Sequence, residues 1–252
     1  MTRPLEGRTV LVTRPEERSD PIAHLLAERG ASVLRAPAIT IESIDGEELD
    51  LAIRDVAARG FAWVAFTSPA TVEVWSRRAP VLGLGPADLR ARVAAVGKAT
   101  EHALTTWGAT VDLVPRVFTT DALGRAFPRG EGRVLLPRAD IAPPDLEDTL
   151  RQRGWEPVRV DAYRTRPAAS LPEEACRALE DGAVDAVTFT SASTVDGFVH
   201  AAGALRGPRV ACIGPVTARR ARERGLPVHA VARPHTAEGL VEAVVRALRG
   251  RP

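Results

Sequence analysis

The chain contains an internal duplication, which limits its possible folds more than any other feature of the sequence. Residues 66–72 read FTSPATV, and residues 189–195 read FTSASTV, at an offset of 191 − 68 = 123 positions. Upstream, VLVTR at 10–14 matches VLLPR at 134–138, and downstream RVAAVG at 92–97 matches RVACIG at 209–214. The two copies therefore carry the same series of strand, loop and helix units.

Short apolar runs alternate with segments of helical spacing along each copy. In the first copy we expect strands at 10–12, 33–41, 63–66, 92–96 and 111–114, and helices at 22–29, 49–58, 70–77, 98–107 and 121–127. The run at 33–41 is too long and too marked by proline to lie wholly inside one sheet, so we interpret its end as a connector. Residues 80–86 predict a loop, and residues 237–248 predict the closing helix. Strands that alternate with helices of this length predict an α/β fold, with parallel sheets covered by helices on both faces.

Length and charge narrow the class of protein. A chain of 252 residues is long enough for about two domains. The formal net charge is +2, from 34 basic and 32 acidic residues, which argues against nucleic acid as a partner. We expect no membrane span, no export signal and, from the spacing of Cys176 and Cys212, neither a disulfide framework nor a metal site. A reduced, cytoplasmic setting fits this pattern best.

The loops that follow strands and open helices are the expected place of function, because ligands bind at the carboxyl ends of parallel strands. The residues in these loops are Thr13, Arg14, Thr67, Ser68, Gly97, Lys98, Arg138, Thr190, Ser191, Ala192 and Gly214. The helices after Ser68 and Ser191 have no carboxylate in the first turn, so their N–H groups and hydroxyls are suited to hold anions. The alternative is that the serines are only N-caps and that Arg14 and Arg138 are solvated surface charges.

Several kinds of chemistry lack a motif. No phosphate-binding loop, dinucleotide fingerprint or Gly-x-Ser-x-Gly elbow occurs in the sequence. The only tyrosine, Tyr163, lies in the second-copy counterpart of the segment around Ile39. A phenol at that position could donate a proton to a leaving group or could simply orient a strand, and the residues alone leave both roles open.

An ordered set of motifs resembles the uroporphyrinogen-III synthase family along nearly the whole chain. The motifs are VTRP at 12–15, FTS at 66–68, VG at 96–97, AYRT at 162–165, FTS at 189–191 and IGPVT at 213–217. Two departures are Lys98-Ala99, where the family often has Pro-Thr, and Ala192, where proline is common. Lys98 could add a contact to a carboxylate.

The resemblance implies a cofactor-free, monomeric enzyme of tetrapyrrole biosynthesis. Such an enzyme takes hydroxymethylbilane, expels its terminal hydroxyl as water, inverts ring D through a spiro-pyrrolenine intermediate and closes the macrocycle to uroporphyrinogen III. By position, Tyr163 matches the family tyrosine that is proposed to help the hydroxyl leave, and Thr217 matches a threonine of the active-site cleft. The substrate carries eight carboxylate side chains, which agrees with dispersed anion sites at the helix starts.

The resemblance also implies two flavodoxin-like domains joined by a two-stranded β connector, one of them discontinuous. We therefore expect a discontinuous domain from residues 1–36 and 168–252, an inserted domain from 42–160, and connectors at 37–41 and 161–167. Two other functions stay open, both without catalysis. One is a regulator that senses tetrapyrroles, which an appended DNA-binding domain would favour; the other is a small-anion binding protein, which an export signal would favour.

Overall fold

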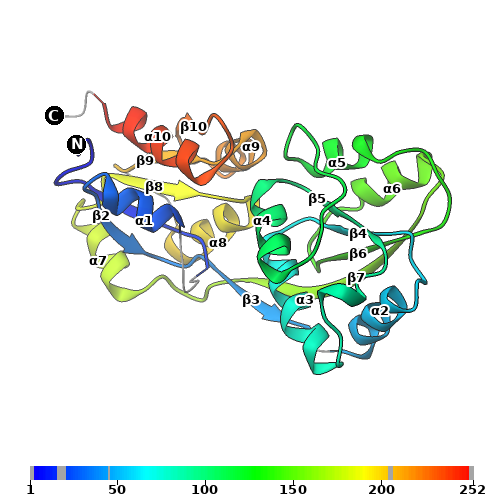
Figure 1. Ribbon diagram of the computed structural model, residues 1–252. Helices are drawn as coiled ribbons and strands as arrows, with labels where there is room; N and C mark the ends of the chain where they lie inside the picture. Colours follow the sequence, from blue (N-terminus) through cyan, green and yellow to red (C-terminus); the bar gives the residue numbers. More distant parts are fainter. Residues whose placement is uncertain (1–2, 16–20, 45, 204–206, 250–252) are drawn as a thin grey trace. The chain divides into compact units, whose positions relative to one another are not determined.

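The computed structural model describes residues 3–15, 21–44, 46–203 and 207–249, which divide into two compact units (Figure 1). Unit 1 consists of Met1–Thr40 and Arg166–Pro252, and unit 2 consists of Ile41–Thr165. Unit 1 is thus discontinuous in sequence, and unit 2 is inserted into it. Both divisions fall within the segments expected to act as connectors, 37–41 and 161–167.

Unit 1 is built on a five-stranded sheet in the order β10-β9-β8-β1-β2, and each pair of neighbouring strands is parallel. Its strands are β1 (Thr9–Val12), β2 (Ser32–Arg35), β8 (Ala186–Phe189), β9 (Arg209–Cys212) and β10 (Val228–Val231). Its helices are α1 (Pro21–Glu28), α7 (Glu173–Glu180), α8 (Ala192–Ala202), α9 (Pro215–Glu223) and α10 (Ala237–Leu248).

Alternation along the strands explains why helices cover both faces of this sheet. Val10 and Val12 pack with residues of α1 and α10, whereas Leu11, between them, packs with residues of α7, α8 and α9. Successive strand residues point to opposite faces, so a strand that is apolar throughout needs a cover on each side. The short apolar runs of the sequence therefore become the central layer of three.

Unit 2 is built on a second five-stranded sheet, in the order β3-β7-β6-β4-β5. Its strands are β3 (Ile39–Ser43), β4 (Trp63–Phe66), β5 (Arg92–Ala95), β6 (Arg133–Ala139) and β7 (Glu156–Pro167). Its helices are α2 (Glu47–Ala57), α3 (Pro69–Val81), the short 3-10 turn η1 (Pro86–Asp88), α4 (Lys98–Trp107), α5 (Thr120–Ala126) and α6 (Asp145–Gln152).

The same three layers form in unit 2. Val64 and Phe66 pack with residues of α2, α3 and α4, and Trp63 and Ala65 pack with residues of α5 and α6. Strands β4, β5, β6 and β7 run parallel to one another. The predicted α/β class with two mainly parallel sheets is therefore confirmed.

The sequence repeat and the structural unit do not coincide. In unit 1, β1 from the first copy pairs with β8 from the second copy. In unit 2, β6 from the second copy pairs with β4 from the first copy. The offsets make β1 equivalent to β6 and β8 equivalent to β4, so each unit combines the beginning of one copy with the end of the other.

Two local predictions from the sequence are wrong. Residues 80–81 do not begin a loop, because α3 continues through Pro80 to Val81. Ala79, which precedes the proline, is buried in the core, and this packing outweighs the hydrogen bond that the proline cannot donate. Residues 111–114 do not form a full strand; they contribute one isolated parallel bridge, between Leu113 and Ala94. Within the described ranges, no helix is long and apolar enough to cross a bilayer.

Candidate active site

The carboxyl ends of β1, β8 and β9 lie along one edge of the unit 1 sheet, because the three strands are adjacent and parallel. Arg14 lies just beyond β1, Ser191 opens α8 after β8, and Gly214 opens α9 after β9. We call this set of strand ends the unit 1 edge. The chain reverses its direction of winding between β1 and β8, and such a switch point is where ligands bind in open α/β sheets.

Two buried threonines fix the strands beneath the unit 1 edge. The Thr13 hydroxyl donates to the carbonyl of Thr188 at 2.7 Å, and the Thr188 hydroxyl donates to the carbonyl of Leu11 at 3.2 Å. Thr13 is fully buried, so its hydroxyl serves the sheet. Its predicted contact with substrate stays a prediction, and Arg14, half-buried and next in the chain, stands closer to solvent.

The serine loops of the two units have equivalent local structures. The Ser68 hydroxyl accepts from the N–H of Thr71 at 3.2 Å, and the Ser191 hydroxyl accepts from the N–H of Thr194 at 3.1 Å. Both serines are therefore N-caps. Under each loop, the last residue of the strand meets an aromatic ring of the following helix: Phe66–Trp75 at 5.5 Å and Phe189–Phe198 at 5.4 Å, both edge-to-face. Thr67, Thr190 and Ala192 beside the caps are half-buried.

The glycines at the starts of α4 and α9 are also equivalent, but different side chains cover them. A methyl group at Gly97 would lie 3.0 Å from the Phe118 side chain, so any larger residue there would require that side chain to shift. A methyl group at Gly214 would lie 3.8 Å from the His235 ring. The offset of 117 residues relates Phe118 to His235, so unit 1 has an imidazole where unit 2 has a phenyl ring.

The unit 2 edge comprises the carboxyl ends of β7, β6, β4 and β5, which are neighbours in that order. Here Tyr163, on β7, lies 3.0 Å from the Ser68 hydroxyl, measured between the two oxygens. Ser68 also lies 2.9 Å from the Thr71 hydroxyl. The structure therefore brings two of the residues predicted from sequence, Tyr163 and Ser68, into direct contact.

Hydrogen counting limits what this cluster can do. The Ser68 hydroxyl carries one proton, and one of its lone pairs already accepts from the Thr71 N–H. If Ser68 donates to Tyr163, the phenol keeps its proton for another acceptor. If Ser68 donates to Thr71, the phenol proton is directed at Ser68 instead. The cluster can thus switch the direction of the Tyr163 proton by rotating hydroxyl groups, without a change of charge.

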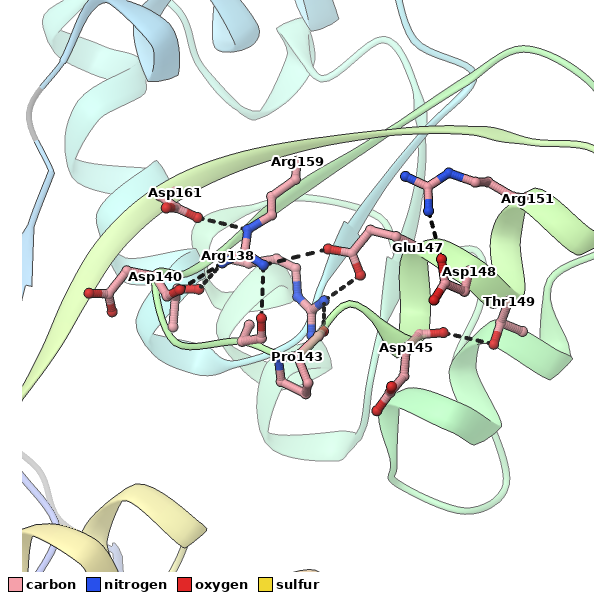
Figure 2. A network of polar contacts seen from close by, with 12 residues as sticks. Arg138, Asp140, Pro143, Asp145, Glu147, Asp148, Thr149, Arg151, Arg159 and Asp161 are labelled. Atoms are coloured by element: carbon pink, nitrogen blue, oxygen red, sulfur yellow. Dashed lines mark hydrogen bonds and ion pairs between the residues drawn. The ribbon is translucent and has the colours of Figure 1, made fainter.

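Arg138 has an internal partner in this structure (Figure 2). Its side chain is 2% exposed, and its guanidinium donates to the Glu147 carboxylate at 2.7 Å and to the carbonyl of Pro143 at 2.8 Å. Glu147 is itself buried. A buried arginine of this kind is held by its ion pair, which argues against the surface-charge interpretation. Its predicted contact with a substrate carboxylate stays a prediction that this burial does not support.

Other candidates take varied positions. Lys98 is exposed and pairs with Glu101 at 2.6 Å, and Thr217 is buried in the first turn of α9.

Burial raises the pKa of the Cys212 thiol to about 12, so this cysteine is protonated at neutral pH and is a poor nucleophile. Among the described residues, no three His, Cys, Asp or Glu side chains gather as a metal site would require.

The comparison with known proteins identifies the family. The profile of the uroporphyrinogen-III synthase HemD family matches residues 20–242. The chain belongs to the uroporphyrinogen-III synthase family. The uroporphyrinogen-III synthase of Synechococcus elongatus is 29% identical over 96% of this chain and 96% of its own. A putative uroporphyrinogen-III synthase of Methanothermobacter thermautotrophicus is 35% identical over 85% of this chain and 89% of its own.

Solved structures of the uroporphyrinogen-III synthase family share the fold. A mutant uroporphyrinogen III synthase of the extremely thermophilic bacterium Thermus thermophilus has a TM-score of 0.68 at 25% identity, over 96% of this chain and 99% of its own. The synthetase of Helicobacter pylori has a TM-score of 0.64 at 18% identity, over 93% and 97%. The likeness at such low identity indicates that the overall fold persists while most side chains change.

The structure adds residues that the sequence motifs of the uroporphyrinogen-III synthase family did not single out. Asp140, Glu147 and Arg159 surround the loop after β6 (Figure 2). Asp140 follows a strand end, so the strand-end argument could have included it. Glu147 lies nine residues after Arg138, on a helix, and Arg159 lies inside a strand. The sequence spacing of Glu147 and Arg159 does not predict that their side chains lie next to the same loop.

Proposed function

We propose that this chain is a uroporphyrinogen-III synthase, a lyase that converts hydroxymethylbilane into uroporphyrinogen III and water. The reaction removes the terminal hydroxyl, inverts ring D and closes the macrocycle. The match of the family profile to residues 20–242 carries this proposal. It places the chain in porphyrin and heme biosynthesis.

The strand-end loops support the proposal on chemical grounds, because the substrate needs many anion contacts. Helices α8 and α9, which begin at the unit 1 edge, have no acidic residue in the first turn, so their N–H groups are not opposed by a carboxylate of that turn. Arg14 stands at the same edge. We propose that these groups, with Thr190, Ser191 and Gly214, hold substrate carboxylates.

Tyr163 is the proposed acid. When Ser68 donates to Tyr163, the phenol proton is free to reach the departing hydroxyl of the substrate, which then leaves as water. The electron-rich pyrrole already expels this hydroxyl readily, so the acid needs to increase the rate only modestly. Ring inversion, in this proposal, follows from how the carboxylates are held and does not need the phenol.

The decisive experiment is product analysis with the purified protein and freshly generated hydroxymethylbilane. The bilane closes spontaneously to the type I isomer, so type III isomer above a protein-free control measures catalysis. We expect type III as the main product. Only type I product, formed at the spontaneous rate, would reject the function and favour a binding protein without catalysis.

We further propose that each unit is a flavodoxin-like domain. Numbered within unit 1, the strand order reads 2-1-3-4-5, which is the flavodoxin order. Two backbone hydrogen bonds, Ile44 N–H to the Ala162 carbonyl and Ala168 N–H to the Ala38 carbonyl, have equal residue sums of 206. A constant sum is the pattern of antiparallel pairing, which supports the two-stranded connector expected near 37–41 and 161–167.

We also propose that the enzyme acts as a cytoplasmic monomer without nucleic acid or membrane partners. The near-neutral charge, +2 over 252 residues, gives little electrostatic attraction to nucleic acid or acidic lipid. Light scattering during size-exclusion chromatography tests the monomer: a mass near 26.9 kDa is expected, and about twice that value would contradict it.

A further inference from the structure

The segment of β7 that carries Tyr163 contains a β-bulge. Arg138 pairs with Asp161, but the next residue of β6, Ala139, pairs with Tyr163, so Ala162 is an extra residue on β7. Ala162 and Tyr163 are consecutive, yet both are buried in the same core cluster. Regular alternation would send the tyrosine to the opposite face. The bulge therefore turns Tyr163 toward Ser68, in the manner that bulges redirect side chains at active sites.

Asp140 bonds β7 at Tyr163 itself and two residues beyond it. Its backbone N–H donates to the Tyr163 carbonyl at 3.0 Å, and its carboxylate accepts from the Thr165 N–H at 3.0 Å. A side chain that bonds the strand two residues beyond the tyrosine fixes the bulged register, because a slip by one residue would remove both bonds. Asp140 thus determines where the phenol of Tyr163 lies, without touching it.

Two arginines in turn hold the loop that contains Asp140 (Figure 2). Arg159 donates to the carbonyls of Ala139 at 3.0 Å, Asp140 at 2.8 Å and Ala142 at 2.8 Å. Arg138 donates to the carbonyl of Pro143 at 2.8 Å. The buried Glu147 neutralises Arg138 at 2.7 Å and lies 3.9 Å from Arg159. The loop between β6 and α6 is therefore fixed through its backbone.

We propose that Asp140 is a positioning residue for Tyr163: it keeps β7 in the bulged register that places the phenol against the Ser68 hydroxyl. The inference rests on the proposed function, since it assigns Asp140 a part in the same reaction. It differs from a general structural role, because it predicts that loss of Asp140 acts through one hydroxyl group.

The single tyrosine of the chain allows a direct measurement. Protein labelled with ¹³C at the tyrosine Cζ atom gives one phenol resonance, whose shift reports hydrogen bonding of that hydroxyl. We expect Asp140→Ala to move this resonance toward its position in Ser68→Ala. Asp140→Asn keeps an oxygen acceptor for the Thr165 N–H, so its resonance should stay near that of the wild type. Asp148→Ala, which removes an exposed partner of Arg151 on α6, is the matched control and should leave the resonance in place.

Kinetics provide the second readout. Asp140→Ala should lower kcat by the same factor as Tyr163→Phe, with KM within about twofold, and Asp140→Asn should restore most of kcat. The double variant Asp140→Ala/Tyr163→Phe should be no slower than Tyr163→Phe alone, because both changes remove one function. Should Asp140→Ala fail to fold, Asp140→Ser takes its place. The serine side chain is too short for its hydroxyl to reach the Thr165 N–H, so this variant also removes that hydrogen bond.

Several results would overturn the inference. These are an unmoved resonance and unchanged kcat in Asp140→Ala, losses that multiply in the double variant, wild-type turnover by Tyr163→Phe, or failure of Asp140→Asn to restore either readout. Failure of the proposed function looks different: the wild type itself would then form no type III product. The phenol resonance would in that case still decide whether Asp140 positions Tyr163.

Discussion

The unit 1 edge and the unit 2 edge derive from the same repeated motifs but differ in several side chains. In unit 2, Arg138 is neutralised by Glu147, and the repeat places Ala23 at the position of Glu147 in unit 1. Helix α4 of unit 2 carries Glu101 in its first turn, whereas its counterpart α9 in unit 1 carries no acidic residue there. The other equivalent pair, α3 and α8, has no acidic residue in either first turn. The phenyl ring of Phe118 in unit 2 is replaced in unit 1 by the imidazole of His235.

The difference indicates that the two edges, which carry the same repeated motifs, have different roles in the reaction. At the unit 1 edge, Arg14 is half-buried, and α8 and α9 begin without an acidic residue in the first turn. Unit 2 buries its strand-end arginine, Arg138, against Glu147 and adds a phenol, Tyr163, where the repeat places Ile39. We infer that unit 1 contributes most to holding the substrate, and that unit 2 contributes most to the loss of the hydroxyl.

The largest effect is expected from Glu147→Ala, which leaves Arg138 buried without its carboxylate. Removing one partner of a buried ion pair costs about 3–5 kcal/mol of folding free energy. All four tryptophans, Trp63, Trp75, Trp107 and Trp155, lie in unit 2, so tryptophan fluorescence follows the unfolding of that unit. The fluorescence midpoint in urea should fall well below that of the wild type.

The matched control for Glu147→Ala removes both charges. Arg138→Met/Glu147→Leu replaces the pair by apolar groups of similar size, which is often neutral or stabilising. We expect this double variant to recover most of the lost stability. An unchanged urea midpoint in Glu147→Ala would mean that the buried pair does not stabilise unit 2 and does not set its edge apart.

The next effect concerns binding at the unit 1 edge. Arg14→Ala should mainly raise KM, because a hydrogen bond to a charged group is worth about 1.5–3 kcal/mol, or roughly ten- to a hundredfold. Arg177→Ala, on the exposed surface of α7, where Arg177 pairs with Glu173, is the control and should leave KM unaltered. If KM is the same in Arg14→Ala and in the wild type, Arg14 does not contact the substrate and is a surface charge.

Tyr163→Phe tests the chemical role of unit 2. General acid catalysis contributes about a hundredfold to ten-thousandfold, but this hydroxyl leaves readily, so we expect kcat to fall severalfold, up to about a hundredfold. The product should remain type III, because inversion does not depend on the phenol. Equal turnover at saturating substrate, after correction for spontaneous type I closure, would show the tyrosine to be structural.

The sequence predicted the α/β class, the strand-end loops and the equivalence of the serine caps, because these follow from local periodicity and from the duplication. It could not predict the Arg138–Glu147 pair. Strand-end arginines look alike in both copies, and only the packing of α6 shows that one of them is buried. The contact between Tyr163 and Ser68 was likewise hidden, because it depends on a bulge at Ala162 that no local pattern indicates.

The smallest effects come from the two N-caps, Ser68 and Ser191. Each is expected to stabilise its helix by about 1 kcal/mol, so Ser68→Ala and Ser191→Ala should lower stability by similar amounts. Urea unfolding, followed by fluorescence for unit 2 and by circular dichroism for the whole chain, measures these losses. Ser68→Thr and Ser191→Thr keep a capping hydroxyl and serve as controls.

The two serine variants should nevertheless differ in kinetics, since only Ser68 contacts Tyr163. A neutral hydrogen bond is worth about 0.5–1.5 kcal/mol, so Ser68→Ala should lower kcat by roughly two- to tenfold. Ser191→Ala should act on KM alone, through the carboxylates held at the unit 1 edge. In the Tyr163→Phe background, Ser68→Ala should have no further effect on kcat, because the hydroxyl that it orients is gone. Equal changes of kcat in both serine variants would remove the distinction between a binding edge and a chemical edge.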